Sequence, residues 1–231
     1  MGRLLDDDAL QRVRRAMDQE ALVESVKNPY GVLRHNPWTR HADLADVLLD
    51  PALGRRIAQF VGTDCVVLFQ DVLVSKPPGT VDRVEWHQDY AYWPLNAPRG
   101  LTLWIAIDDA EVDNGCLHYV PGSHLLGEHA PTDFVLGAAQ LEKPELPALS
   151  VDEAMAVAAP ICAGEALVHH PLTWHMSPPN RSTRPRRAWS ISWIHPDVRW
   201  DPAHAPHPFN HELEPVAGDT LSGPIFPKVG I

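Results

Sequence analysis

Three His-x-Asp triplets stand out among the residues that could bind a metal: His41–Asp43, His87–Asp89 and His195–Asp197. With 13 histidines in 231 residues, about one such triplet is expected by chance, so the spacing alone proves little. Side chains at i and i+2 point to one side only on an extended strand, where they alternate with period two. Of the three pairs, only His87 and Asp89 lie in a run typical of a strand, residues 84–90, so we expect these two side chains to face the same way.

A third ligand has to come from a distant strand, and His175 is the best-placed candidate. His169 and His170 compete with it, but as neighbours on a strand they would point to opposite faces. Two histidines and one carboxylate on one side of a metal leave open positions, which is typical of non-haem Fe(II) oxygenases. The sequence therefore predicts a ligand triad of His87, Asp89 and His175.

The strand predicted over residues 186–194 has two unlike faces. One face would carry bulky side chains, those of Arg187, Trp189, Ile191 and Trp193. The other would carry Arg186 followed by small side chains, those of Ala188, Ser190 and Ser192. A bulky face packs under helices, whereas a small face leaves room for one guanidinium, which would bind a carboxylate in bidentate fashion. A solvated pair of arginines at the start of a strand accounts for the same residues equally well.

The residue pattern changes once along the chain, from one typical of helices to one typical of strands. Residues 6–27 carry apolar side chains at helical spacing, and a second helical region covers residues 43–61 with an interruption at Pro51. Short β-branched and aromatic runs then alternate with Gly, Pro and Asn turns, at residues 65–74, 84–90, 101–107, 117–120, 166–170 and 186–194. This order predicts a mainly β fold, an antiparallel sandwich or barrel with N-terminal helices packed on one sheet.

Length and composition favour one globular domain. We expect helical support over 1–61, a core over about 62–195 with an insertion or lid at 125–160, and an aperiodic tail at 196–231. A net charge of −11 argues against nucleic acid and membrane surfaces as partners, and three unclustered cysteines argue against a disulfide framework. The N-terminal residues do not form a signal peptide, so we expect a cytoplasmic protein, either monomer or homodimer, that acts on a small molecule.

In their order along the chain, these motifs resemble those of the phytanoyl-CoA dioxygenase family of Fe(II)/2-oxoglutarate oxygenases, which includes ectoine hydroxylase. The likeness rests on three segments: His87-Gln-Asp89 with Tyr92-Trp93-Pro94, Asn114-Gly115 with Pro121-Gly122-Ser123-His124, and His175-x-Ser177-x-x-Asn180. It implies a double-stranded β-helix, a cupin-like jelly roll, over about residues 62–195. It also implies Fe(II), the cosubstrate 2-oxoglutarate and O2.

The resemblance further implies a role for individual residues. The ligand triad would bind iron, and Arg186, eleven residues past the distal histidine, would bind the distal carboxylate of 2-oxoglutarate. Gln70 and Ser177 match positions that help to hold the cosubstrate. Tyr92 and Trp93 are candidates to line the substrate pocket, although core packing explains them equally well. The other histidines near these motifs are expected to be structural: His118, His124, His169 and His170.

The reaction implied by the resemblance is hydroxylation of an aliphatic C–H, with release of succinate and CO2. Asp89 favours hydroxylation over halogenation, because related halogenases lack this carboxylate. Desaturation, epimerisation and ring closure with the same cofactors stay open, as do a cupin-type metalloenzyme without 2-oxoglutarate and an inactive binding jelly roll. The acidic net charge and only four lysines favour a small molecule of secondary metabolism over a CoA thioester.

Overall fold

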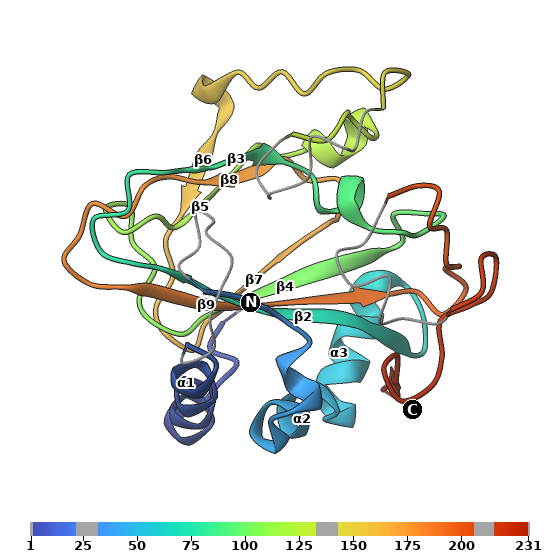
Figure 1. The fold of residues 1–231 in the computed structure, drawn as a ribbon, viewed down its shortest axis with the longest axis horizontal. Helices are drawn as coiled ribbons and strands as arrows, with labels where there is room; N and C mark the ends of the chain where they lie inside the picture. The colour runs from blue at the N-terminus through green and yellow to red at the C-terminus, as the bar shows by residue number, and fades with distance from the viewer. Residues whose placement is uncertain (1, 22–31, 133–142, 206–214, 231) are drawn as a thin grey trace.

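The computed structural model describes residues 2–21, 32–132, 143–205 and 215–230, and two antiparallel sheets face each other in it (Figure 1). The larger sheet has the strand order β1 (Val32–His35), β2 (Val66–Lys76), β9 (Arg186–Ile194), β4 (Gly100–Ala106) and β7 (Ala166–His169), and β10 (Lys228–Val229) also pairs with β2. The smaller sheet has the order β3 (Val84–His87), β8 (His175–Ser177), β5 (Leu117–Tyr119) and β6 (Val157–Ala159). This architecture confirms the predicted mainly β jelly roll with N-terminal helices.

Three helices cover the outer face of the larger sheet: α1 (Asp7–Ala21), α2 (Ala42–Leu48) and α3 (Pro51–Val61) (Figure 1). Pro51 starts α3 instead of interrupting a helix, because the Asp50 side chain caps the N-terminus by accepting from the Ala52 N–H at 2.8 Å. The helix ends at Gly62, whose φ of 78° favours glycine. Residues 22–27 of the predicted first helix lie outside the described residues.

Each of the six predicted extended runs contains a strand. Four strands of the described residues lie outside these six runs: β1, β6, β8 and β10. Each of them spans between two and four residues, which is too short for alternation to show in a sequence. They form because neighbouring strands of the same sheets offer backbone partners.

The predicted insertion at 125–160 contributes to the smaller sheet. Its last residues form β6, which pairs with β5 at the sheet edge. Leu149, Val151 and Ala156 pack against the outer face of this sheet, on a buried cluster that includes Trp86 and Trp174. Within the predicted insertion or lid, residues 149–156 thus lie along the outer side of the smaller sheet (Figure 1), and residues 157–159 form its edge strand. Residues 133–142 lie outside the described residues.

The described parts of the predicted tail, residues 196–205 and 215–230, complete the core at one end of the sandwich. Trp200, Leu221 and Phe226 join an apolar cluster with Phe69 and Trp93. The last described residues then form β10 and end beside α3 (Figure 1). Gly54 allows this crossing, because a Cβ at that position would lie 2.5 Å from the backbone nitrogen of Gly230.

A second contact ties the tail to the segment before β6. The Lys143 ammonium lies 2.8 Å from Oε1 of Glu128 and 2.9 Å from Nε2 of His204. The other ring nitrogen of His204 lies 2.7 Å from the carbonyl oxygen of Trp93. This cluster joins three segments that are distant in sequence.

None of the described helices has the length and the apolar character that a bilayer crossing requires.

Asp71 is the charged residue buried most deeply in the layer between β2 and the helices. It is fully buried, and its Oδ2 accepts a 2.7 Å hydrogen bond from the indole N–H of Trp189. Its Oδ1 has no hydrogen-bond partner among the described residues. Burial raises the pKa of Asp71 from 3.8 to about 7, against the opposing effect of hydrogen bonds from Trp189 and Trp38.

We therefore expect Asp71 to make a contribution to the stability of the protein that falls as the pH rises from about 4 to about 7, opposite in sign to the contribution of His87 and His175, whose pKa values burial lowers. In this window the folded state keeps a proton on Asp71 that the unfolded chain has lost, so unfolding becomes easier as the pH increases. Asp71→Asn should remove this contribution, so that the stability at pH 8 rises relative to that at pH 5, and should stabilise the protein at pH 8 by about 1 kcal/mol or more. Urea unfolding at pH 5 and pH 8 measures both effects. Asp46→Asn, at an exposed position of α2, is the control, and an unchanged pH dependence of stability in Asp71→Asn would contradict the assignment.

Candidate metal centre

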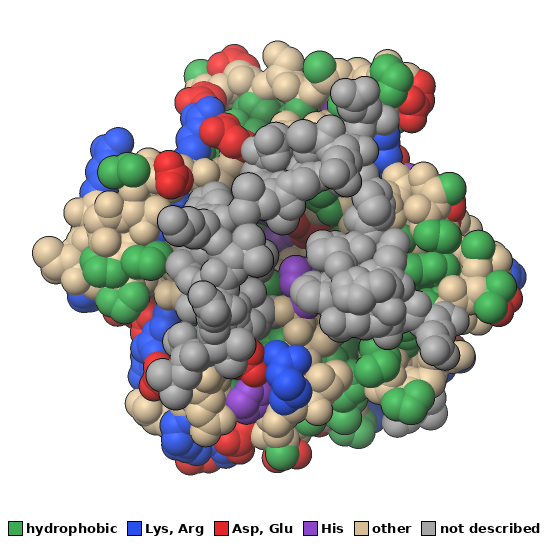
Figure 2. Space-filling view, in the orientation of Figure 1, with side chains coloured by type: hydrophobic (Ala, Val, Ile, Leu, Met, Phe, Trp, Pro, Cys, Tyr) green, Lys and Arg blue, Asp and Glu red, His purple; other side chains and the backbone are tan. Residues whose placement is uncertain are grey.

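The structure brings the three residues of the predicted ligand triad together between the two sheets. One ligand atom from each of His87, Asp89 and His175 lies within 4.8 Å of the others. Oδ1 of Asp89 is 3.8 Å from Nε2 of His87 and 3.5 Å from Nε2 of His175. Histidine and acidic side chains are visible near the centre of one face of the molecule (Figure 2). The triad therefore forms a cluster inside the sandwich.

Asp89 reaches the cluster from a turn, which corrects the prediction of a continuous strand over residues 84–90. The pairing of β3 with β8 stops at His87, and Asp89 is the first residue of the short 3-10 helix η2 (Asp89–Tyr92). Gln88 between them stays extended, with φ −117° and ψ 134°, so His87 and Asp89 still face the same side.

Gln88 anchors this turn from the opposite side. Its amide nitrogen donates to the carbonyl oxygens of Gly127 and Leu172, at 2.9 and 2.8 Å. Its amide oxygen accepts from the backbone N–H of His129 at 2.8 Å. These bonds hold the turn against two other loops, and the position of Asp89 depends on them.

Both histidines of the triad have the tautomer that a metal ligand needs. The Nδ1–H of His87 donates to the carbonyl oxygen of Glu85 at 2.8 Å, and the Nδ1–H of His175 donates to that of Thr173 at 2.9 Å. Burial lowers the pKa of both imidazoles, so both are neutral. The Nε2 lone pairs are left to face Asp89, and this donor set fits a divalent metal.

The two oxygens of Asp89 have separate environments. Oδ2 accepts hydrogen bonds from the Thr102 hydroxyl at 2.6 Å and from Nε2 of His169 at 3.0 Å, whereas Oδ1 faces the triad histidines. Burial raises the pKa of Asp89, but the electrostatic interaction with His175 and the hydrogen bond from His169 lower it by more. Together they hold the pKa of Asp89 below its ordinary value.

His169 was expected to be structural, yet it belongs to the surroundings of the metal centre. Because Asp89 is ionised, Nε2 of His169 carries the hydrogen that it shares with Oδ2. Its Nδ1 then accepts from the Tyr119 hydroxyl at 3.0 Å. A chain of hydrogen bonds thus runs from Tyr119 through His169 to Asp89, and no sequence motif indicated it.

The structure confirms the predicted phase of β9. Arg186 is buried on the face between the sheets, where its Nη2 donates to the Ser177 hydroxyl at 2.8 Å and its guanidinium lies 5.3 Å from the centre of the Trp104 ring. Arg187 lies on the opposite face and makes a bidentate pair with Asp108, at 2.8 and 2.9 Å. Two adjacent arginines therefore have different environments, and only Arg186 is directed toward the interior of the sandwich.

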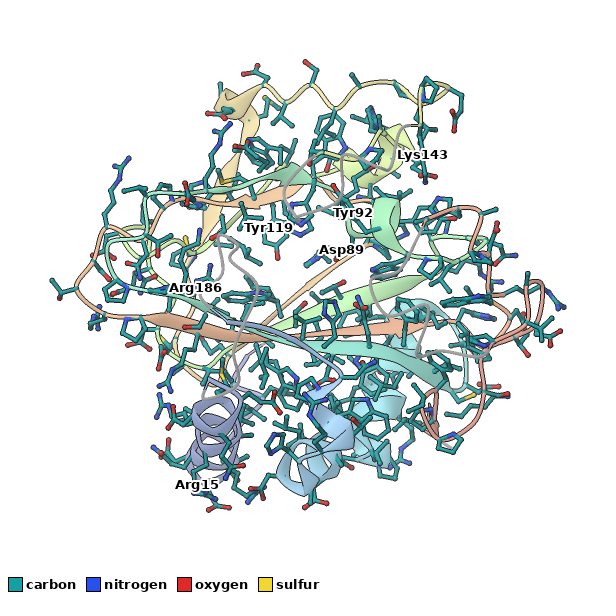
Figure 3. All side chains as sticks on the ribbon, in the orientation of Figure 1. Arg15, Asp89, Tyr92, Tyr119, Lys143 and Arg186 are labelled. Atoms are coloured by element: carbon teal, nitrogen blue, oxygen red, sulfur yellow. The ribbon has the colours of Figure 1, made fainter. Side chains whose placement is uncertain are left out.

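The labelled side chains in Figure 3 show this arrangement. Asp89, Tyr92, Tyr119 and Arg186 lie in the space between the two sheets, whereas Arg15 and Lys143 lie outside it. Gln70 is opposite Ser192 in the register of β2 and β9, and Ser192 is opposite Thr102 on β4. Because side chains of paired residues share a face, Gln70 points to the same side as Thr102.

The two aromatic residues that were predicted to line a pocket lie in different surroundings. Tyr92 stays between the sheets, at 6.4 Å from the ring of His87, and its hydroxyl accepts from the backbone N–H of Thr132 at 2.9 Å. Trp93 is 3 % exposed and packs edge-on against Phe69. Its position is that of a core residue, while Tyr92 lies between the sheets beside His87.

Comparisons with known proteins agree with the site. The profile of the phytanoyl-CoA dioxygenase family matches residues 3–188. The chain belongs to this family. The match includes the whole ligand triad and Arg186, and it confirms the resemblance seen in the motifs.

Among curated relatives, phytanoyl-CoA dioxygenase domain-containing protein 1 of Bos taurus is 32 % identical over 143 residues, which cover 58 % of this chain and 47 % of the relative. A probable alpha-ketoglutarate-dependent hypophosphite dioxygenase of Stutzerimonas stutzeri is 27 % identical over 204 residues, covering 86 % of this chain and 66 % of the relative. This chain spans about half the length of the first of these relatives.

Among solved structures, the non-haem alpha-ketoglutarate-dependent carbocyclase SnoK from nogalamycin biosynthesis superposes with a TM-score of 0.78 at 25 % identity, covering 99 % of this chain and 90 % of SnoK. The epimerase SnoN, solved with Fe3+, alpha-ketoglutarate and a nogalamycin compound, has a TM-score of 0.77 at 23 % identity, covering 98 % and 91 %. The second likeness concerns the fold alone.

We expect removal of a triad residue to abolish metal binding. His175→Ala should weaken the binding of Fe(II) or Co(II) by more than about 100-fold. Thr102→Val, which removes a hydroxyl that holds the ligand Asp89, should weaken it by the roughly 10–100-fold typical of losing an outer partner. Equilibrium dialysis under anaerobic conditions measures the metal affinity of both variants. His118→Ala is the control, because His118 is opposite Met176 on the outer face of the smaller sheet. Unchanged affinity in His175→Ala would contradict the site.

Proposed function

We propose that this protein is an Fe(II)- and 2-oxoglutarate-dependent oxygenase that hydroxylates an aliphatic C–H of a small molecule. The observation that carries the proposal is the ligand triad, in which one oxygen of an ionised Asp89 and two neutral imidazole nitrogens converge between the sheets. Family membership supports the same reaction class. The descriptions of the hypophosphite dioxygenase, SnoK and SnoN name alpha-ketoglutarate, which supports 2-oxoglutarate as the cosubstrate. SnoN was solved with Fe3+, which supports iron as the metal.

In this proposal the triad holds the iron, which when bound supplies the redox chemistry that couples decarboxylation of 2-oxoglutarate to oxidation of the substrate. Thr102 and His169 keep Oδ2 of Asp89 occupied, so that Oδ1 is the oxygen offered to the metal. The carbonyl oxygens of Glu85 and Thr173 fix both imidazoles in the binding tautomer. These contacts set the site before any ligand arrives.

Arg186 is the proposed anchor for the distal carboxylate of 2-oxoglutarate. It is buried on the inner face of β9, where the low dielectric strengthens its attraction to an anion. Ser177 fixes the guanidinium through its hydroxyl, and Gln70 faces the same interior from β2. The buried Arg186 also distinguishes this function from a cupin-type metalloenzyme without 2-oxoglutarate, which needs no cation at this place.

The proposed reaction consumes one substrate C–H, one O2 and one 2-oxoglutarate, and it yields one alcohol, one succinate and one CO2. The likeness to a carbocyclase over 99 % of this chain favours ring closure as a second candidate. Ring closure removes two hydrogens from the substrate and releases water, with the same fate for 2-oxoglutarate. The mass of the product separates the two outcomes.

The proposed substrate is a small molecule of secondary metabolism, not an acyl-CoA. A chain of net charge −11 with four lysines offers little to the phosphates of CoA. Tyr92 and Tyr119 both lie between the sheets (Figure 3), and aromatic walls with a few polar groups are typical of small-molecule pockets. SnoK, a structural neighbour, is named for nogalamycin biosynthesis, which supports secondary metabolism as the context.

The decisive experiment is an anaerobic titration of the protein with Fe(II) and 2-oxoglutarate. We expect a weak visible charge-transfer band when both are bound. After admission of O2, a panel of metabolites should reveal a product heavier by one oxygen atom with an equimolar amount of succinate. Absence of the band would contradict the proposed function. Turnover of branched acyl-CoA thioesters, with other small molecules inert, would contradict the proposed substrate class.

Arg186→Ala should raise the 2-oxoglutarate concentration needed for half saturation by tenfold or more, because a charge-assisted bond contributes about 1.5–3 kcal/mol. Arg187→Ala is the matched control from the opposite face of β9. It should leave that concentration unchanged and lower the melting temperature, since Asp108 loses its bidentate partner. A larger cosubstrate defect in Arg187→Ala than in Arg186→Ala would refute the assignment.

A further inference from the structure

Lys76 is a buried cation beside Arg186 that neither the sequence motifs nor the proposed mechanism uses. It is the last residue of β2 and stands directly opposite Arg186 in the register with β9. Paired residues share a face, so both side chains lie between the sheets. Lys76 is 0 % exposed and Arg186 is 1 % exposed.

The two cations are joined through one hydroxyl. Ser177 Oγ accepts from the Lys76 ammonium at 2.9 Å and from Nη2 of Arg186 at 2.8 Å, and it donates to the carbonyl oxygen of Gly115 at 2.8 Å. A hydroxyl has one hydrogen and two lone pairs, so these three bonds use all of its capacity. Ser177 therefore acts here as a bridge that sets the relative positions of Lys76 and Arg186.

The remaining bonds of Lys76 fix it on the same segment. Its ammonium also donates to the carbonyl oxygens of Ser177 and Pro178. Its aliphatic stem packs under the turn at Gly115, where an added Cβ would lie 3.3 Å from Cδ of Lys76 and 2.6 Å from the Pro178 carbonyl oxygen. Gly115 has a φ of +88°, so both the conformation and the contact require glycine.

None of the three acceptors of Lys76 is a carboxylate. Burial and, after it, the charge on Arg186 together lower the pKa of Lys76 to about 7, while Asp82 opposes the shift. Lys76 and Arg186 thus place two cationic side chains side by side in the interior, and an anionic group bound beside them is attracted by both.

We propose that Lys76 is a positioning residue of the cosubstrate site, which together with Arg186 makes this site selective for a 2-oxo acid with a second, distal carboxylate. The inference rests on the proposed function, because it assumes that the anion is the distal carboxylate of 2-oxoglutarate. Lys76 acts through Ser177 and through its charge. A purely structural lysine would brace the connection between β8 and β9 without affecting the choice of acid.

The test compares two acids that share the chelating 2-oxo acid group and differ in the distal carboxylate. Dissociation constants of 2-oxoglutarate and 2-oxopentanoate are measured anaerobically on the Fe(II) protein, from the charge-transfer band. Lys76→Met removes the charge, and Lys76→Gln removes the charge while keeping a donor for Ser177. Lys228→Met, at an exposed position of β10, is the matched control.

We expect Lys76→Met and Lys76→Gln to weaken 2-oxoglutarate binding by about tenfold or more, with less than about a twofold effect on 2-oxopentanoate. Lys228→Met should change neither. Thermal melting of the metal-free variants shows whether they fold. If Lys76→Met does not fold, the comparison of the two acids is made with Lys76→Gln. Equal weakening of both acids, or no weakening of either, would overturn the inference and leave the proposed function intact. A wild-type protein without a band for either acid would overturn the proposed function and the inference with it.

Discussion

A carboxylate stays ionised away from water only where neighbouring groups replace the lost hydration, and Asp89 meets this condition on all sides. Its Oδ2 is held by Thr102 and His169, and its Oδ1 faces two imidazoles. Those partners come from both sheets, since Thr102 and His169 belong to the larger sheet and the triad histidines to the smaller one. The spacing and register of the sandwich therefore have to satisfy this one group.

The larger sheet meets that requirement with a row of polar side chains at one level. Gln70, Ser192, Thr102 and His169 follow one another in register across β2, β9, β4 and β7. Apolar clusters occupy the interior on both sides of this row, one around Phe69 and the other around Trp104. The polar groups around Asp89 thus lie at one level, Lys76 and Arg186 lie at another, and the apolar clusters supply stability.

The sequence predicted the parts of the site that depend on local alternation. The period of two identified the facing of His87 and Asp89, and in β9 it separated Arg186 from Arg187. The sequence did not predict the roles of Thr102, His169 or Lys76. The pattern around a single polar residue in an apolar strand is the same whether its side chain faces the helices or the space between the sheets. Their roles follow from register between strands distant in the chain.

Some details of the fold were beyond the sequence for the same reason. β8 carries His175 and Ser177 but has only three residues, so its strand character arises from pairing with β3 and β5. The turn that begins at Asp89 was hidden by the strand-like composition around it. Residues 149–156 showed no clear period in the sequence, yet Leu149, Val151 and Ala156 pack on the outer face of the smaller sheet.

The adjacency of Arg186 and Arg187 has a consequence for how the gene can change. Removal or addition of one codon within β9 would exchange the two faces of every following residue, so that tryptophans would fill the interior and small residues would meet the helices. Length variation is therefore barred from this strand, while the turns at its ends can absorb it. Natural diversification of this scaffold should proceed by substitution in β9 and by insertion elsewhere.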